Sequence, residues 1–150
     1  MQIDNDLIQG KIDIIEKNLT FLGEYKDIGK EVFLNSYKDI QAVKYSLFEI
    51  IEACIDTASH IISTKGFERA ESYSEMFEIL GNNNIIESEL SKNLADMARF
   101  RNILVHRYAK VDNSKVLLYV QEELKNVENY VKKLLELLQH QGEQENNSIK

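Results

Sequence analysis

The stretch SYKDIQAVKYSLFEIIEACIDTASHIISTKG, residues 36–66, decides the fold. Its apolar residues recur at spacings of three and four, the period of an α-helix rather than the alternation of a strand. Ser36 with Asp39 three residues later resembles a capping box, and Gly66 is a typical helix stop. The stretch therefore predicts one long helix between these two signals.

Apolar residues line two faces of this predicted helix and leave only a narrow polar strip. The strip consists of Glu49, Glu52, Asp56 and His60. A helix that is apolar on two faces packs against neighbours on both sides. We therefore expect an all-α chain in which the helix over residues 36–66 is central.

The rest of the chain, which contains no proline, has the same helical period. We expect a first helix ending near Gly23, a short helical segment over about 24–34, and a short helix from Ser72 to Gly81. Another helix begins near Glu87, and Asp112 or Asn113 caps a final helix that runs to Leu138. These patterns predict a single domain over residues 1–139, followed by a polar tail, 140–150, that we expect to be disordered.

The composition limits the classes of function. The 150 residues carry a formal net charge of −7, which argues against a surface that binds nucleic acid everywhere. No stretch is apolar enough to span a bilayer, and the single cysteine, Cys54, lies in an apolar run and cannot form an internal disulfide. The three scattered histidines show no metal-ligand spacing, so we expect neither a metal nor another cofactor. A cytoplasmic protein fits these features.

Positive charge is concentrated in one segment, RFRNILVHRYAK, residues 99–110. Between Asp96 and Asp112 the only charged residues are basic: Arg99, Arg101, Arg107 and Lys110. Arg101 falls where the stripe of Leu90, Leu94 and Met97 requires a core residue. A buried guanidinium cannot lose its charge, so it needs a carboxylate or a bound anion. The sequence leaves two alternatives open: an internal ion pair with Asp56 or Glu52, or an anion site.

His106 lies five residues after Arg101, about 140° away around an uninterrupted helix. The two side chains can cooperate only if the helix breaks around 104–106 or if they meet across a dimer axis. Alternatively, His106 is an ordinary helix-end residue. Acting together, an imidazole could move a proton at an RNA ribose or leaving oxygen while a guanidinium held the phosphate. Asn102 would support this chemistry, and Arg99, Arg107 and Lys110 would bind the RNA backbone.

The motif RNILVHRY, with Arg101, Asn102, His106 and Tyr108, resembles the signature of the HEPN superfamily and looks most like its HepT toxin branch. The segments FEIIEACIDTASHIIS, MFEIL and LADMARFRN also look like HepT segments. The resemblance implies an up-and-down helical bundle that dimerises, which brings two copies of Arg101 and His106 into one cleft. It also implies a metal-independent ribonuclease toxin neutralised by a MntA-like nucleotidyltransferase antitoxin, which transfers AMP to the motif tyrosine, here Tyr108.

Other interpretations stay open beside this resemblance. The chain could be a non-catalytic HEPN-like subunit that binds nucleotide or protein and partners a nucleotidyltransferase, or a purely structural helical dimer. Tyr108 could simply continue the apolar stripe as a packing aromatic residue. Asp56 is expected to support the site, by pairing with Arg101 or orienting the motif, rather than to act directly.

Overall fold

A computed structural model describes residues 2–105 and 112–149, and within these ranges it contains helices and no strand. The elements are α1 (Asn5–Leu22), the 3-10 turn η1 (Gly23–Tyr25), α2 (Lys30–Leu34), α3 (Tyr37–Lys65), α4 (Tyr73–Asn82), α5 (Ser88–Val105), α6 (Asn113–Glu122) and α7 (Leu124–Ile149). The all-α fold predicted from the sequence is confirmed. None of the described helices is long and apolar enough to cross a bilayer.

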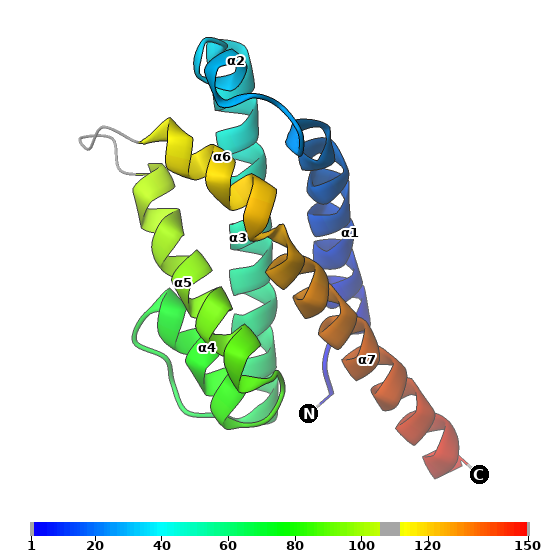
Figure 1. Cartoon of the computed structure of the whole chain (residues 1–150). Coiled ribbons are helices and arrows are strands. Elements are labelled where there is room, and N and C mark those ends of the chain that lie inside the picture. Colours follow the sequence, from blue (N-terminus) through cyan, green and yellow to red (C-terminus); the bar gives the residue numbers. More distant parts are fainter. Residues whose placement is uncertain (1, 106–111, 150) are drawn as a thin grey trace.

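The long helix α3 is the centre of the bundle, as residues 36–66 predicted (Figure 1). It contacts α1 on one side and α4 and α5 on the other, while α6 and α7 continue from α5 back across the bundle towards α1. The Ser36 side chain accepts a hydrogen bond from the backbone N–H of Asp39, and Gly66 ends the helix with a φ of 69°. These local interactions fix both ends of α3, because Gly66 adopts the left-handed conformation without a steric cost.

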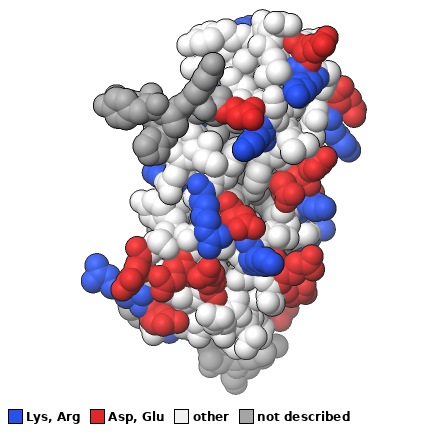
Figure 2. All heavy atoms as spheres, turned by 60° about the vertical axis from the view of Figure 1, so that its left-hand side comes forward, with Lys and Arg blue, Asp and Glu red and all other residues white. Residues whose placement is uncertain are grey.

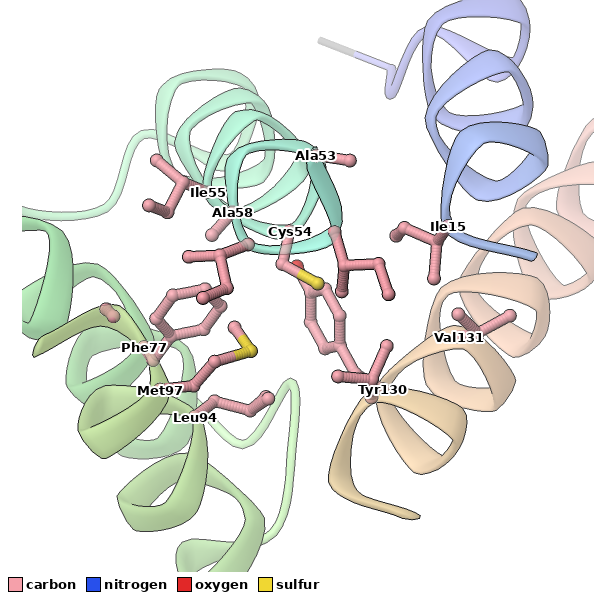
Figure 3. Close-up of a cluster of buried hydrophobic side chains, with 14 of the residues drawn as sticks. Ile15, Ala53, Cys54, Ile55, Ala58, Phe77, Leu94, Met97, Tyr130 and Val131 are labelled. Atoms are coloured by element: carbon pink, nitrogen blue, oxygen red, sulfur yellow. The ribbon is translucent and has the colours of Figure 1, made fainter. Parts of the chain in front are cut away.

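Figure 3 shows part of the core, in which apolar side chains from α1, α3, α4, α5 and α7 meet; α2 and α6 add further buried residues to it. Cys54 of α3 is fully buried there, and burial raises the pKa of its thiol. It therefore serves as a small apolar residue, as the sequence predicted. Nearby, the buried Thr57 hydroxyl lies 2.7 Å from the Tyr130 hydroxyl and donates to the Cys54 carbonyl at 2.8 Å. The Thr57 and Tyr130 hydroxyls thus have partners within this part of the core.

The segment 24–34 differs from the single short helix expected there. It forms η1 and α2, separated by a turn. Gln121 of α6 donates hydrogen bonds of 3.1 Å to the carbonyls of Tyr25 and Ile28, which lie at this turn. A partner almost one hundred residues away thus satisfies the backbone groups that a continuous helix would have paired.

The final helix is also divided, since α6 ends at Glu122 and α7 begins at Leu124. Asp112 caps α6, as one of the two expected alternatives. At the break, the buried Asn126 donates to the Glu123 carboxylate at 2.8 Å and accepts from Asn93 of α5 at 3.2 Å. These side-chain hydrogen bonds stabilise the break between α6 and α7, although the apolar stripe of the sequence continues across it.

The expected disordered tail differs from the structure, because α7 continues as a helix to Ile149. The Gln141 side chain donates to the Ile3 carbonyl and to Asn5, and accepts from the Ile3 backbone N–H, each at 2.9 Å. These contacts join the two ends of the chain. A polar composition did not reveal them, since they depend on where the N-terminal segment runs.

The helices α4 and α5 approach each other closely. A Cβ at Gly81 would collide with the Ser91 side chain, whose hydroxyl donates to the Phe77 carbonyl at 2.8 Å. The sequence predicted Gly81 as a helix end, but α4 includes it and ends at Asn82. Glycine at this position therefore permits helix contact. The contact sets where the first residues of α4 lie relative to α5.

Candidate active site around Arg101

Arg101 lies near the end of α5 and turns towards α3. Its Nε donates a hydrogen bond to the Glu52 carboxylate, and the two groups form an ion pair. The side chain of Arg101 is 20% exposed and that of Glu52 is 34% exposed. Of the two carboxylates weighed from the sequence, Glu52 is therefore the one that meets Arg101.

Two aromatic rings also contact the Arg101 guanidinium. Its central carbon lies 5.5 Å from the centre of the Phe48 ring on α3 and 5.0 Å from the centre of the Tyr73 ring on α4. Both distances fall within the range of cation–π attraction. Phe48 and Glu52 are four residues apart on α3, so a single face of that helix supplies both contacts.

This arrangement orients the guanidinium without using all of its donors. Among the described residues, Glu52 is the only hydrogen-bond partner of Arg101, and it binds at Nε. The two terminal nitrogens of a guanidinium form a planar fork that matches two phosphoryl oxygens. Arg101 is thus held by one edge while its terminal nitrogens can still bind an oxyanion. The ion pair and the anion site, alternatives in the sequence, are compatible in the structure.

Asp56, the expected supporting residue, has a different partner. It binds Lys11 of α1 with a distance of 2.8 Å between Oδ2 and Nζ. Both side chains are substantially exposed, at 48% and 31%. Asp56 follows Glu52 by four residues and so lies one turn along α3. The expected pairing of Asp56 with Arg101 does not occur, because Glu52 and the two rings already surround the guanidinium.

Arg99, an expected RNA-binding residue, is engaged by two carboxylates. Its terminal nitrogens lie 2.7 Å from Asp96 on α5 and 3.2 Å from Glu78 on α4. Figure 2 shows the side of the molecule towards α4 and α5, where basic and acidic side chains interleave over the surface. The concentration of positive charge seen in the sequence is therefore partly offset by acidic neighbours from other turns and from α4.

Asn102, the expected supporting residue next to Arg101, is exposed and lines a pocket of about 460 Å³. The pocket lies between α5 and the segment that leads into α4, and Tyr73 forms part of its wall. Asn102 thus faces open space next to the residues that hold Arg101. Its amide carries both donors and an acceptor for a bound molecule.

Four expected site residues lie outside the described part of the chain: His106, Arg107, Tyr108 and Lys110. The helix α5 is continuous up to Val105. A break at Leu104 or Val105 therefore does not occur, and the expected convergence of His106 with Arg101 stays a prediction. Within residues 2–105 and 112–149, no three His, Cys, Asp or Glu side chains are grouped to hold a metal ion.

The aromatic contacts to Arg101 were not predicted from the sequence. In the sequence, Phe48 is simply one of the apolar residues of the long helix, and Tyr73 follows Ser72 at the start of a short one. The i, i+4 spacing of Phe48 and Glu52 was a visible signal for the first contact. Tyr73 had no such signal, because it reaches Arg101 through the packing of α4 against α5.

Comparison with known proteins gives consistent matches over most of the chain. A family model described as Ribonuclease HepT-like matches residues 15–134. The mRNA nuclease HepT of Shewanella oneidensis is 32% identical over 127 residues, which cover 85% of this chain and 95% of that protein. The tRNA nuclease HepT of Aphanizomenon flos-aquae is 27% identical over 132 residues, covering 88% of this chain and 90% of that protein.

Solved structures agree with the sequence matches. A tri-AMPylated HEPN toxin of Shewanella oneidensis in complex with its MNT antitoxin superposes with a TM-score of 0.80 at 30% identity. The match covers 87% of this chain and 98% of that one. The cytosolic protein YutE of Bacillus subtilis also gives a TM-score of 0.80, covering 93% of each chain at 17% identity, which shows a shared fold.

Proposed function

Because the chain belongs to the HepT-like ribonuclease family, we propose that it is the ribonuclease toxin of a toxin–antitoxin pair and acts on RNA in the cytoplasm. The observation that carries this proposal is the state of Arg101. Glu52 holds its Nε, two rings hold its plane, and its terminal nitrogens have no hydrogen-bond partner among the described residues. A cation oriented in advance in this way suits a phosphate that gains charge during cleavage.

In the proposed mechanism, Arg101 binds the non-bridging oxygens of the scissile phosphate. His106 takes the proton of the ribose 2′-hydroxyl as that oxygen attacks phosphorus, or gives a proton to the leaving 5′-oxygen. An imidazole with an ordinary pKa of about 6.5 can do either at neutral pH. Neither step needs a metal ion, and Asn102 supports the bound nucleotide.

A homodimer would complete this site. Two copies of Arg101 and His106 in one cleft would supply one imidazole as base and the other as acid. Ile103 and Val105 in the last turn of α5 are 46% and 41% exposed, which supports a protein contact beside Arg101. A contact there would also exclude water from the phosphate.

The partner we propose is a MntA-like nucleotidyltransferase antitoxin that attaches AMP to Tyr108. The AMP-bearing toxin of Shewanella oneidensis, solved with its MNT antitoxin, supports this regulation. A nucleotide two residues from His106 would bring bulk and negative charge to the site. The attached AMP would prevent RNA from binding, both by its bulk and because its phosphate repels the phosphates of the RNA.

A second candidate is a non-catalytic nucleotide- or protein-binding subunit that partners the nucleotidyltransferase. The pairing of Arg99 with Asp96 and Glu78 favours it, since this arginine is not free to attract RNA. The two candidates differ in one measurable property. The first cleaves RNA, whereas the second binds a partner without cleaving.

The deciding experiment is cleavage of total RNA by the purified protein in the presence of a chelator. His106→Ala should abolish cleavage, whereas His140→Ala, which removes an exposed histidine of α7, should not. Arg101→Lys keeps the charge but not the fork, so cleavage should fall by ~10²- to 10³-fold. Unchanged circular dichroism must accompany each loss. Cleavage that survives His106→Ala would contradict the proposal that this protein cleaves RNA through Arg101 and His106.

A further inference from the structure

The pocket beside Asn102 is lined by apolar, aromatic and polar side chains. It lies between α5 and the 70–76 segment, and its volume is about 460 Å³. Ala70, Met76 and Ala98 supply apolar surface, while Tyr73 and Asn102 supply an aromatic ring and an amide. Small-molecule sites combine apolar walls with a few placed polar groups in this manner, at volumes of roughly 300–1,000 Å³.

The pocket adjoins the proposed phosphate site through two residues. Tyr73 lines the pocket, and its ring centre also lies 5.0 Å from the Arg101 guanidinium carbon. Asn102 directly follows Arg101 on α5 and lines the same pocket. A phosphate on the terminal nitrogens of Arg101 would therefore have the pocket next to it, separated by one aromatic side chain.

The charges around the pocket favour a neutral group rather than a second anion. Arg99 reaches its rim but is engaged by Asp96 and Glu78, and Glu71 adds another carboxylate to the lining. A further phosphate would meet this negative charge. A flat, uncharged ring would meet apolar and aromatic surface together with an amide that donates and accepts hydrogen bonds.

We propose that this pocket binds the nucleobase of the nucleotide whose phosphate Arg101 holds, and that it selects the base at the cleavage position. The inference rests on the proposed ribonuclease function. Tyr73 and Met76 provide the stacking and apolar contact, and Asn102 reads the edge of the base. The site thus determines which RNA sequence is cut, while Arg101 and His106 determine that it is cut.

The first test compares nucleoside monophosphates with inorganic phosphate as ligands of the whole protein. AMP, CMP, GMP and UMP are titrated separately, with NMR or calorimetry as the readout. A base that stacks and hydrogen-bonds should tighten binding over phosphate by ~10-fold or more for at least one nucleotide. Equal affinity for phosphate and for all four nucleotides would overturn the proposal.

Filling the pocket provides the matched control. Ala70→Trp should occupy the space and reduce the affinity of the preferred nucleotide to that of phosphate, while phosphate binding changes by less than about twofold. Ser63→Trp adds the same bulk at an exposed position of α3 away from the pocket and should preserve the difference. Asn102→Ala, an exposed substitution that does not disturb the core, should also reduce the preference. If Ala70→Trp and Asn102→Ala both leave the nucleotide preference intact, the pocket does not hold the base.

Sequencing of the cleaved RNA ends separates this inference from the proposed function. The protein should cut with a base preference at one position, and Asn102→Asp should change that preference. RNA cleavage without any base preference would overturn the pocket proposal and leave the ribonuclease standing. Nucleotide binding that Ala70→Trp abolishes, in a protein that cleaves no RNA, would support the pocket and overturn the ribonuclease.

Discussion

The N-terminal part of α5 and its last described turn continue one stripe of residues but meet different neighbours. Leu94 and Met97 are fully buried and face the apolar layer formed with α3, α4 and α7. One turn later the stripe reaches Arg101, which meets the carboxylate of Glu52 and two aromatic rings. The position on the stripe determines the direction of a side chain, whereas the neighbouring helices determine what that side chain encounters.

The two parts of α5 also differ in the exposure of their apolar side chains. In the core part the residues of the stripe are buried, while the final turn carries two exposed apolar residues beside the stripe, Ile103 at 46% and Val105 at 41%. Residues of the first part should therefore control the stability of the monomer. Residues of the second should control binding and cleavage, with small effects on stability. Substitutions in each part test this division.

The largest effect should come from the core part. Leu94→Ala removes a fully buried side chain and leaves a cavity, so the free energy of unfolding should fall by ~2–5 kcal/mol. Urea denaturation at fixed protein concentration measures this change. Leu118→Ala on α6 removes the same atoms from a side chain that is 53% exposed and should cost less than about 1 kcal/mol. Similar losses in both variants would mean that Leu94 does not lie in the core.

The next effect should appear at the Arg101 end. Glu52→Gln keeps the size of the side chain but removes the charge that holds Nε, so the guanidinium should lose its fixed orientation. We expect kcat to fall by about 10-fold, or ~1.4 kcal/mol of activation free energy, with a smaller change in stability. Glu49→Gln, three residues before Glu52 on α3, alters a carboxylate that accepts from Asn18 rather than from Arg101, so this matched control should retain activity. If both variants cleave normally, Glu52 does not position Arg101.

The predictability of the fold follows the range of the interactions. The ends of α3 and the start of α4 were predicted because Ser36, Gly66 and Ser72 act on backbone groups within a few residues. The breaks near Tyr25 and Glu123 were not predicted. They depend on Gln121 and Asn93, whose positions are set only when separate helices pack together.

The candidate site shows the same distinction. Arg101 was predicted because it interrupts a local apolar stripe, and Glu52 was one of two carboxylates on the right face of the long helix. The contact from Tyr73 and the adjoining pocket were not predicted, since they require α4 to lie close to α5. The close approach of the two helices depends on Gly81. The sequence indicated Gly81 only as a helix end and not as a packing residue.

A smaller effect should follow from releasing Arg99. Replacing Glu78 by Gln and Asp96 by Asn removes both carboxylates that engage it, so RNA should bind several-fold more tightly at low salt. The slope of log K against log salt should steepen by up to ~0.7, the contribution of one phosphate contact to a single strand. Filter binding across a salt series measures both quantities.

The control for this variant removes the same charge elsewhere. Glu87→Gln with Glu89→Gln alters two exposed carboxylates at the other end of α5. It raises the net charge equally and should leave the salt slope nearly unchanged. If the two double variants bind RNA alike, net charge rather than Arg99 accounts for the gain.

The smallest effect concerns Asp56, which contacts Lys11 rather than Arg101. The pair is exposed, so Asp56→Asn and Lys11→Met should each reduce stability by less than about 1 kcal/mol.

Only the Asp56 variant should lower the rate of cleavage, and only slightly. Asp56→Asn removes a negative charge one turn from Glu52, and its loss of kcat should stay below about threefold, because an exposed charge is strongly screened. Lys11→Met breaks the same pair but keeps that charge, so cleavage should be retained. Equal losses of cleavage in the two variants would show that the pair only joins α1 to α3, and that the charge of Asp56 has no separate role at the site.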